Sequence, residues 1–257
     1  MANGNSIAAP VRNFFNEIGS FVMLSAEAIV GCVRPPLRLW LWLQQMEFIG
    51  VGSLPIILLT SAFSGAVFTL QSVYAFSMFN MESMVGATVA LAMTREISPV
   101  FTALMITGRA GSAMATELGT MRVTEQIDAL KTMAVNPVHY LFVPRLLAAL
   151  VVFPALTMIF NLTAVAGSYL VGVEMWGIDP GNFIQKIEWY VQPSDVTSGL
   201  IKAAVFGGFI TLVACFRGYR AAGGARGVGA ATTQSVVIGS VSIMIIDYFL
   251  TVLMFDL

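Results

Sequence analysis

Charged residues are scarce in this 257-residue chain, at 11% of the sequence, whereas apolar residues make up 57%. Soluble domains carry about 25% charged residues, so this shortfall and the long uncharged runs exclude an ordinary soluble protein. The net charge of −1 leaves no basic field that would attract nucleic acid, and we expect no nucleic-acid partner. The composition predicts an all-α polytopic membrane protein.

Residues that bind metals are also rare. The chain has two cysteines, Cys32 and Cys215, and a single histidine, His139. The cysteines lie far apart without ligand spacing, so we interpret them as small apolar residues in helices. One histidine cannot form a histidine cluster. We therefore predict no metal site.

Five apolar stretches are long enough to span a membrane, which takes about 20 residues. They cover residues 50–76, 86–118, 146–173, 197–216 and 234–256. The second stretch would form about 50 Å of helix, more than a hydrocarbon core of about 30 Å. We therefore expect this helix either to extend into water or to break at Ser98-Pro99. No domain boundary or internal repeat is visible, which predicts a single domain over residues 1–257.

The N-terminal segment, about residues 10–45, has a different pattern. Phe14, Ile18, Phe21 and Val22 recur at helical spacing, which predicts a helix lying in the membrane interface. Pro35-Pro36 would end it and form an elbow before a transmembrane core at 48–257.

Lysine and arginine gather in alternate connections. They occur in the N-terminal segment and in the loops 119–145 and 217–233, whereas segments 77–85 and 174–196 hold mainly acids. Basic residues favour the cytoplasmic side. We therefore expect a cytoplasmic N-terminus and, after five spans, a periplasmic C-terminus.

Small residues recur every four positions near the end of the second stretch. Gly111, Ala115 and Gly119 form one such row, and Gly108 lies on a neighbouring row. This spacing lets helix backbones approach closely in lipid, which predicts a helix-packing surface. For the glycines alone, ordinary tight packing without further function is the favoured explanation.

A short amphipathic helix is predicted in the loop that follows. Thr124 is placed as its N-cap, Glu125 and Asp128 in its first turn and Lys131 in its last, which suits the helix dipole. The Asn-Pro pair at 136–137 would end it. Interfacial helices are usually basic, but this one has more acids than bases. Docking to another protein is therefore favoured over resting on the membrane.

Two long blocks resemble a known family. They are "GRAGSAMATELGTMRVTEQIDALKTMAVNPVHYLFVPRLLA" from Gly108 and "GYRAAGGARGVGAATTQSVV" from Gly218. Both are similar to the MlaE permease family, the membrane subunit of ABC transporters that carry phospholipids. The resemblance runs from about residue 48 to the end. Ala134 and Asn136 stand where the family commonly has Gly and Asp, which predicts an unchanged shape and one lost acidic contact.

The resemblance implies several partners. Residues 122–137 would form a coupling helix that fits a groove of a separate ABC ATPase subunit, present in two copies. The chain has no Walker A sequence, so ATP and Mg would be used by that partner and no cofactor by this chain. A homodimer and an outer-side MCE-domain protein, usually a hexamer, are also implied. The predicted ATPase-coupling residues are Arg122, Glu125, Gln126, Asp128, Leu130 and Lys131.

Four ionisable residues lie inside predicted spans: Arg95, Glu96, Lys202 and Asp247. They are expected to form one tier in the outer half of the bilayer, where two bases neutralise two acids. Such charges usually face a bundle interior or a wet cavity. One interpretation is a set of structural salt bridges. The other is a cavity where the two bases bind a lipid phosphate.

The resemblance favours the second interpretation, because it implies a lipid pocket between two permease copies near these positions. Leu70 and Tyr74 would line its acyl region. For Arg109 and Glu117 we predict structural roles, as helix-end charges or an interchain pair. The loop "GYRAAGGARGVG" lacks nucleotide-binding fingerprints. We interpret it as a tight cytoplasmic connection that places Arg217 and Arg220 at the lipid headgroups.

The leading hypothesis is thus a non-catalytic permease subunit of an ATP-driven phospholipid transporter in the inner membrane. An ion- or metabolite-coupled secondary transporter is the alternative, although no inverted repeat is visible. An intramembrane enzyme is disfavoured, because the chain has no histidine cluster and no G-x-S-x-G motif.

Overall fold

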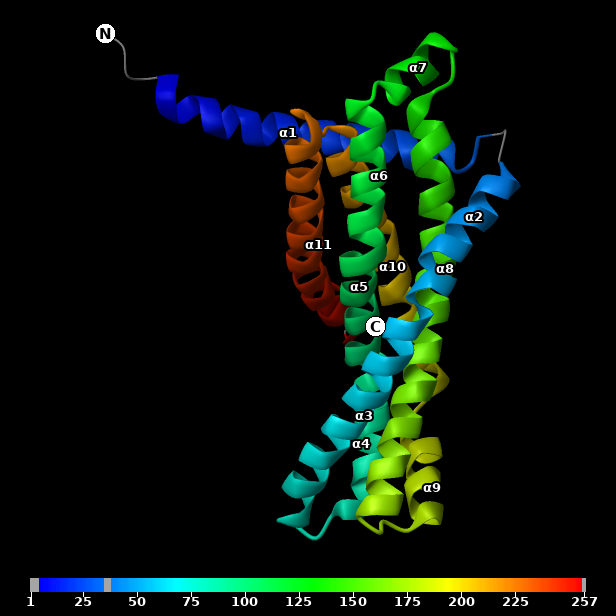
Figure 1. Cartoon of the computed structure of the whole chain (residues 1–257). Helices are drawn as coiled ribbons and strands as arrows, with labels where there is room; N and C mark the ends of the chain where they lie inside the picture. Colours follow the sequence, from blue (N-terminus) through cyan, green and yellow to red (C-terminus); the bar gives the residue numbers. More distant parts are fainter. Residues whose placement is uncertain (1–4, 35–37, 256–257) are drawn as a thin grey trace.

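The computed structural model describes residues 5–34 and 38–255, and no strand occurs among them (Figure 1). Five helical stretches in these residues are long and apolar enough to cross a membrane. They are Leu39–Ser77, Glu82–Val123, Pro137–Met175, Pro193–Tyr219 and Gly224–Met254. The prediction of an all-α polytopic membrane protein is confirmed.

Sixteen helical elements are described, and five of them are short 3₁₀ or π segments. The α-helices are α1 (Asn5–Gly31), α2 (Leu39–Ile49), α3 (Leu54–Ser77), α4 (Val85–Ala92), α5 (Ser98–Ile106), α6 (Ser112–Val123), α7 (Gln126–Thr132), α8 (Pro137–Tyr169), α9 (Pro180–Tyr190), α10 (Pro193–Tyr219) and α11 (Gly224–Phe255). The 3₁₀ segments are η1 (Val51–Ser53) and η2 (Glu82–Met84), and the π segments are η3 (Met93–Ile97), η4 (Thr107–Gly111) and η5 (Leu170–Met175).

The second span is one continuous helical stretch of 42 residues. It runs through η2, α4, η3, α5, η4 and α6, so it extends beyond a bilayer core instead of breaking at Pro99. Pro99 lies in the first turn of α5, directly after η3. Proline offers no N–H and crowds the preceding turn, and a widened π turn accommodates this inside a continuous helix.

The first span begins earlier than the expected residue 50, because α2 leads through η1 into α3. Arg109 holds this junction against the second span: its guanidinium donates to the carbonyl of Phe48 and, at 3.3 Å, to Ser53 Oγ. A Cβ at Gly52 would lie 2.1 Å from Arg109 Nη2, so glycine leaves room for the guanidinium. Arg109 therefore has a structural role. The elbow predicted at Pro35-Pro36 lies outside the described residues.

Helix α1 lies across one end of the bundle, roughly perpendicular to the spans (Figure 1). Phe21 faces the bundle, where its ring lies 5.3 Å from Phe216 and 6.0 Å from Phe209 between centroids. Ile18 and Val22 are exposed, while the Phe14 side chain lies outside the described set. This arrangement fits the predicted interfacial helix.

Helix α8 packs against α3 and α10 at the centre of the bundle. A Cβ at Gly65 would lie 2.0 Å from the Ala164 carbonyl oxygen, and one at Gly167 would lie 2.3 Å from that of Ala62. Small residues thus let the α3 and α8 backbones touch, as is common for helix pairs in lipid.

The segment 174–196, expected as an outer loop, contains α9. Asp179 caps this helix by accepting a hydrogen bond of 2.8 Å from the Asn182 N–H. Phe183 is buried, with its ring centroid 5.7 Å from that of Tyr169. The cap and this single apolar anchor explain a helix that hydropathy alone does not reveal.

Candidate functional site

Three of the four predicted intramembrane charges meet in one cluster. Lys202 Nζ on α10 lies 2.6 Å from Glu96 Oε2 on η3 and 3.2 Å from Asp247 Oδ1 on α11. It also donates at 2.6 Å to Thr251 Oγ1, one turn beyond Asp247. The Lys202 side chain is only 2% exposed. An ammonium group this deeply buried needs such partners, because an uncompensated buried charge is costly.

Arg95, the fourth predicted charge, binds a different acid. Its Nη2 lies 2.6 Å from Asp195 Oδ1, and its Nε donates to the same oxygen at 2.7 Å. Asp195 lies in the first turn of α10, where its Oδ2 accepts from the Gln192 N–H at 2.8 Å in a capping box. The Asp195 side chain is 3% exposed, whereas that of Arg95 is 39% exposed.

A cavity of about 440 Å³ opens beside these groups. Arg95, Glu96 and Lys202 line it together with residues from the start of α10 and from the end of α11. The further lining residues are Ser194, Asp195, Ser198, Thr251 and Met254. Segment η3 supplies both Arg95 and Glu96, and π turns often occur at functional sites. The cavity therefore presents a guanidinium and a carboxylate on one widened turn.

The expected balance of two bases and two acids is wrong in one respect. Asp195 joins the group, so Arg95 and Lys202 face three acids: Glu96, Asp195 and Asp247. Among the residues that the structure describes, no group of three His, Cys, Asp or Glu side chains is arranged to hold a metal ion. A polar ligand entering the cavity would meet both charge signs.

Leu70 and Tyr74 lie on α3 and are 39% and 67% exposed. Neither lines the charged cavity. A separate, mainly apolar groove of about 340 Å³ runs between α3 and the second span. Its walls include Phe63 and Phe101 as well as Met93 and Ile97, the first and last residues of η3. Sequence reasoning missed this groove, because its residues share the apolar character of every span.

Helix α7 occupies the predicted coupling segment and projects beyond α1 at the same end of the bundle (Figure 1). Thr124 is not its N-cap: it is the C-cap of α6, and Glu125 occupies the N-cap position with a left-handed φ of 61°. Ile127 is buried against α8 residues, with Leu130 packed beside it. These contacts hold the short helix on the bundle while Glu125 and Gln126 are exposed.

Asp128 is paired within the segment. Arg122 Nη1 donates to its two oxygens at 2.8 and 2.9 Å, and Lys131 Nζ donates to Oδ1 at 3.1 Å. These hydrogen bonds, that of Lys131 first, lower the pKa of the Asp128 carboxyl below its ordinary value of 3.8. The same contact raises the pKa of Lys131 above 10.5. Of the two predicted coupling acids, Asp128 is thus paired within the segment. Glu125 is exposed and forms no ion pair with the described residues.

The end of α7 also differs from expectation. The helix stops at Thr132, and Asn136 instead caps α8 by accepting from the Val138 N–H at 2.8 Å. Its Nδ2 donates to Glu27 Oε1 of α1 at 2.7 Å, a contact that an aspartate could not make. Ala134 has a φ of 57°, a conformation that glycine adopts more easily. The segment thus keeps a backbone suited to Gly while carrying Ala.

The row of small residues on the second span faces α10 and α11. A Cβ at Gly119 would lie 3.2 Å from Val228 Cγ1 on α11. On α10, a Cβ at Gly218 would lie 2.6 Å from the carbonyl oxygen of Ala115. At Gly111 the nearest atom would be 3.6 Å away, in Ile210. A Cβ at Gly108 would meet no described atom within 4 Å.

Glu117 forms an ion pair within the chain. Its Oε2 lies 2.8 Å from Arg145 Nη2 on α8, and the Arg145 side chain is 5% exposed. The expectation of an interchain pair or a helix-end charge is replaced by this contact between the second and third spans. Arg145 also donates to the Leu141 carbonyl at 2.7 Å.

Comparison with known proteins bears directly on these features. Residues 42–253 match the family described as Permease MlaE. A Rickettsia felis protein named "Probable ABC transporter permease protein" is 44% identical over 251 residues, covering 98% of this chain and 97% of the relative. The Haemophilus influenzae "Intermembrane phospholipid transport system permease protein MlaE" is 37% identical over 254 residues, covering 98% and 97%. The Arabidopsis thaliana protein TRIGALACTOSYLDIACYLGLYCEROL 1, chloroplastic, is 40% identical over 214 residues, which are 83% of this chain and 61% of the relative. The chain therefore belongs to the MlaE permease family.

Proposed function

We propose that this chain is the permease subunit of an ATP-driven transporter that moves phospholipid between the inner membrane and an outer-side MCE-domain protein, maintaining the lipid composition of the outer membrane. The observation that carries the proposal is the cavity of about 440 Å³ that presents Arg95 and Glu96 beside the buried Lys202. The names of the Haemophilus influenzae and Rickettsia felis relatives support a phospholipid cargo and an ABC transporter.

The cavity suits a lipid headgroup for electrostatic reasons. Arg95 and Glu96 expose 39% and 37% of their side chains, so a cation and an anion are both reachable. A guanidinium can bind a phosphate through two parallel hydrogen bonds. Lys202 is committed to Glu96, Asp247 and Thr251. We infer that Arg95 meets the phosphate and that Lys202 compensates one of the two negative charges of Glu96 and Asp247 when the cavity is empty.

The acyl chains would leave the cavity along the neighbouring apolar surface. The groove of about 340 Å³ begins at η3, the segment that also carries Arg95 and Glu96. Leu70 and Tyr74 extend this exposed apolar face of α3. A second copy of the chain placed against this face would enclose the lipid, so we propose a homodimer with the pocket between its copies.

The energy source would be a separate ABC ATPase subunit, in two copies, that binds ATP and Mg. Helix α7 projects at one end of the bundle, with Glu125 and Gln126 exposed on it and Ile127 anchoring it. A movement of the ATPase would pass through α7 into α6 and α8, which it connects. With the ATPase on the cytoplasmic side, we propose that the N-terminus and α7 lie in the cytoplasm and that the C-terminus lies in the periplasm, towards a hexameric MCE-domain protein.

Purification from native membranes, without overexpressed partners, tests the proposal. We expect an ABC ATPase and an MCE-domain protein to copurify with the chain, and reconstituted vesicles to transfer phospholipid only when ATP is supplied. A chain that purifies without an ATPase and moves an ion or metabolite down an ion gradient would instead support the secondary transporter.

A further inference from the structure

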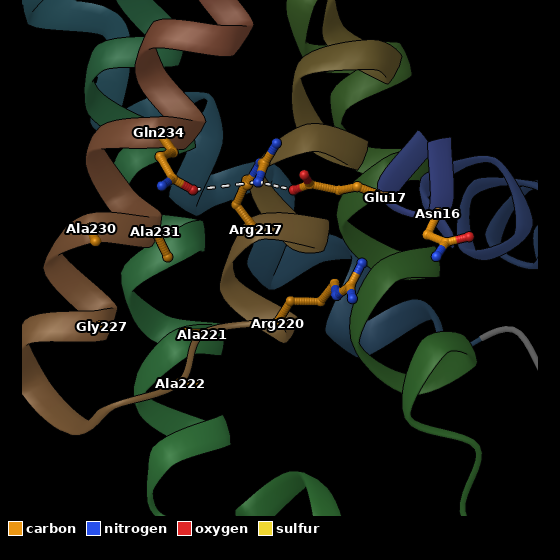
Figure 2. A pocket seen from close by; sticks show the side chains of 10 residues that line it. All are labelled: Asn16, Glu17, Arg217, Arg220, Ala221, Ala222, Gly227, Ala230, Ala231 and Gln234. Carbon is orange, nitrogen blue, oxygen red and sulfur yellow. Dashed lines mark hydrogen bonds and ion pairs between the residues drawn. The ribbon is translucent and has the colours of Figure 1, made fainter. Parts of the chain in front are cut away.

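A cavity of about 590 Å³ lies between α1 and the α10–α11 connection (Figure 2), at the end of the bundle that carries α7 (Figure 1). Helix α1 contributes Asn16 and Glu17, the end of α10 contributes Arg217 and Arg220, and α11 contributes Gln234. The remaining wall consists of glycine and alanine residues from the α10–α11 connection and from the start of α11. Polar groups from three helices thus converge over a surface of small side chains.

The two arginines of this cavity make different contacts. Arg217 donates to Glu17 Oε1 and, at 3.3 Å, to Gln234 Oε1, so its charge is neutralised (Figure 2). Arg220 is exposed, with its Cζ 5.4 Å from the centroid of the Phe216 ring. No described carboxylate lies within 4.0 Å of its guanidinium. The ring steadies Arg220 through a cation–π contact that leaves the edge donors of the guanidinium available.

The start of α11 adds a second attraction for an anion. The first backbone N–H groups of a helix have no partner within the helix, and the dipole makes this end positive. Gly227, in the first turn of the 32-residue helix α11, lines the cavity. Gly223 and Gly224, with φ values of 89° and 70°, turn the chain into this helix without a side chain over its end. The Ala222 backbone lies against Gly227, so this end of the helix attracts an anion through its dipole and not through close contact at Gly227.

The height of the cavity identifies the source of the phosphate. Arg217 and Tyr219 end the fourth span, Gly224 begins the fifth, and the interfacial helix α1 crosses beside them. Lipid headgroups are expected at this level, because it is where the two spans end. The lining side chains carry two positive charges and one negative, which leaves one positive charge for the single negative charge of a phosphodiester.

We propose that this cavity binds the phosphate of an anionic phospholipid headgroup from the leaflet on the α7 side. The site is separate from the Arg95 cavity and does not depend on the proposed function. A bound lipid would join α1 to the fourth and fifth spans through one headgroup, on the face of the bundle from which α7 projects.

Native mass spectrometry of the detergent-purified full-length chain, titrated with phosphatidylglycerol, tests the proposal. Arg220→Gln should weaken binding about tenfold, because a hydrogen-bonded charge contact is lost. Arg226→Gln is the matched control: Arg226 is exposed in the first turn of α11 but does not line the cavity, so binding should change less than twofold. Glu17→Gln should tighten binding about threefold, because it frees Arg217 for the phosphate.

A second variant covers the case in which Arg220→Gln fails to fold. Ala230 lies exposed on the cavity wall, so Ala230→Leu would fill space without changing charge, and it should also weaken binding about tenfold. Phosphatidylcholine with the same acyl chains should bind more weakly, because its choline cation is repelled by the net positive charge of the cavity.

The remaining measurements distinguish a lipid from free phosphate, from a bound protein and from binding at the Arg95 cavity. Displacement of phosphatidylglycerol by millimolar inorganic phosphate would make the site one for free phosphate and overturn a lipid site. Unchanged lipid binding in Arg220→Gln together with loss of a copurifying protein would assign the cavity to that protein, which also overturns it. Arg95→Ala is measured in parallel: a binding loss confined to that variant contradicts this second site and leaves the proposed transport cavity standing.

Discussion

Arg95 and Asp195 are 100 residues apart in sequence, yet two nitrogens of Arg95 contact the same oxygen of Asp195. Asp195 Oδ1 lies 2.6 Å from Arg95 Nη2 and 2.7 Å from Arg95 Nε. The Asp195 side chain is 3% exposed and also closes the capping box of α10. One acid therefore fixes both the start of the fourth span and the position of the guanidinium that faces the cavity. Arg95 is pre-positioned by a residue that does not itself need to meet the ligand.

Replacing Asp195 tests this link. Asp195→Asn should lower the free energy of unfolding by about 1–3 kcal/mol, because a charge-assisted pair is lost at a buried position. Thermal unfolding of the purified chain in detergent measures the change. Glu188→Gln serves as control, since Glu188 is an exposed acid on the neighbouring helix α9. An unchanged midpoint in Asp195→Asn would show that the pair contributes nothing to stability.

Asp195 also shows what the sequence could and could not predict. Hydropathy locates five spans within about ten residues of their observed ends, because long apolar runs must be helical in lipid. Counting charges by segment placed Asp195 in an outer loop, although Pro193 followed by Asp195 is a recognisable helix start. Which base it would meet depends on the packing of two distant helices, and no local pattern encodes that.

The same distinction applies to the predicted coupling segment. Its amphipathic character predicted a helix in the right loop. The cap was misplaced, because Thr124 completes α6 and the chain then turns through a left-handed Glu125. A Thr followed by Glu has no glycine to signal such a turn. Here tertiary packing of Ile127 and Leu130 overrides the local capping preference.

Reversing the acids of α7 tests docking to an ATPase. Glu125→Lys with Asp128→Lys should leave membrane insertion intact but reduce ATPase copurification at least tenfold, because the outward-facing acid Glu125 becomes a base and the ion pairs of Asp128 within the segment are lost. Asp128→Lys also places a third base beside Arg122 and Lys131, so Glu125→Lys alone is the cleaner variant. Glu188→Lys, on the opposite end of the bundle, is the charge-matched control. Normal assembly and transport in Glu125→Lys would reject the docking role.

Topology is tested by reporters at two positions. A reporter inserted near Gly224, between α10 and α11, should be cytoplasmic, whereas one fused after Leu257 should be periplasmic. The reason is the concentration of Arg217, Arg220 and Arg226 at the end of α10, in the connection and at the start of α11. Paired alkaline phosphatase and fluorescent-protein fusions give opposite signals on the two sides. Both positions on one side would contradict five spans.

The cavity residues allow lipid binding to be separated from structural pairing. Arg95 is partly exposed and Lys202 is buried among Glu96, Asp247 and Thr251. If Arg95 holds the phosphate, Arg95→Ala should reduce bound phospholipid about tenfold, and it should also lower the free energy of unfolding by about 1–3 kcal/mol, because the buried Asp195 loses its partner. Lys202→Ala should reduce both, because it leaves two carboxylates without their base. Asp247→Asn should be milder, since it removes one competitor for Lys202 and leaves Glu96 in place.

A charge swap sharpens this test further. Arg95→Glu with Glu96→Arg conserves net charge but moves the cation by roughly 100° around the helix. It also places a carboxylate against Asp195, the partner that holds Arg95 in position. A loose neutralising cluster would tolerate the swap, whereas a bidentate phosphate contact would lose its lipid. Phospholipid bound per purified chain and the thermal midpoint are measured together for each variant. Full lipid occupancy in both Arg95→Ala and Lys202→Ala, combined with a large loss of stability, would mean that the cluster only locks the helices together.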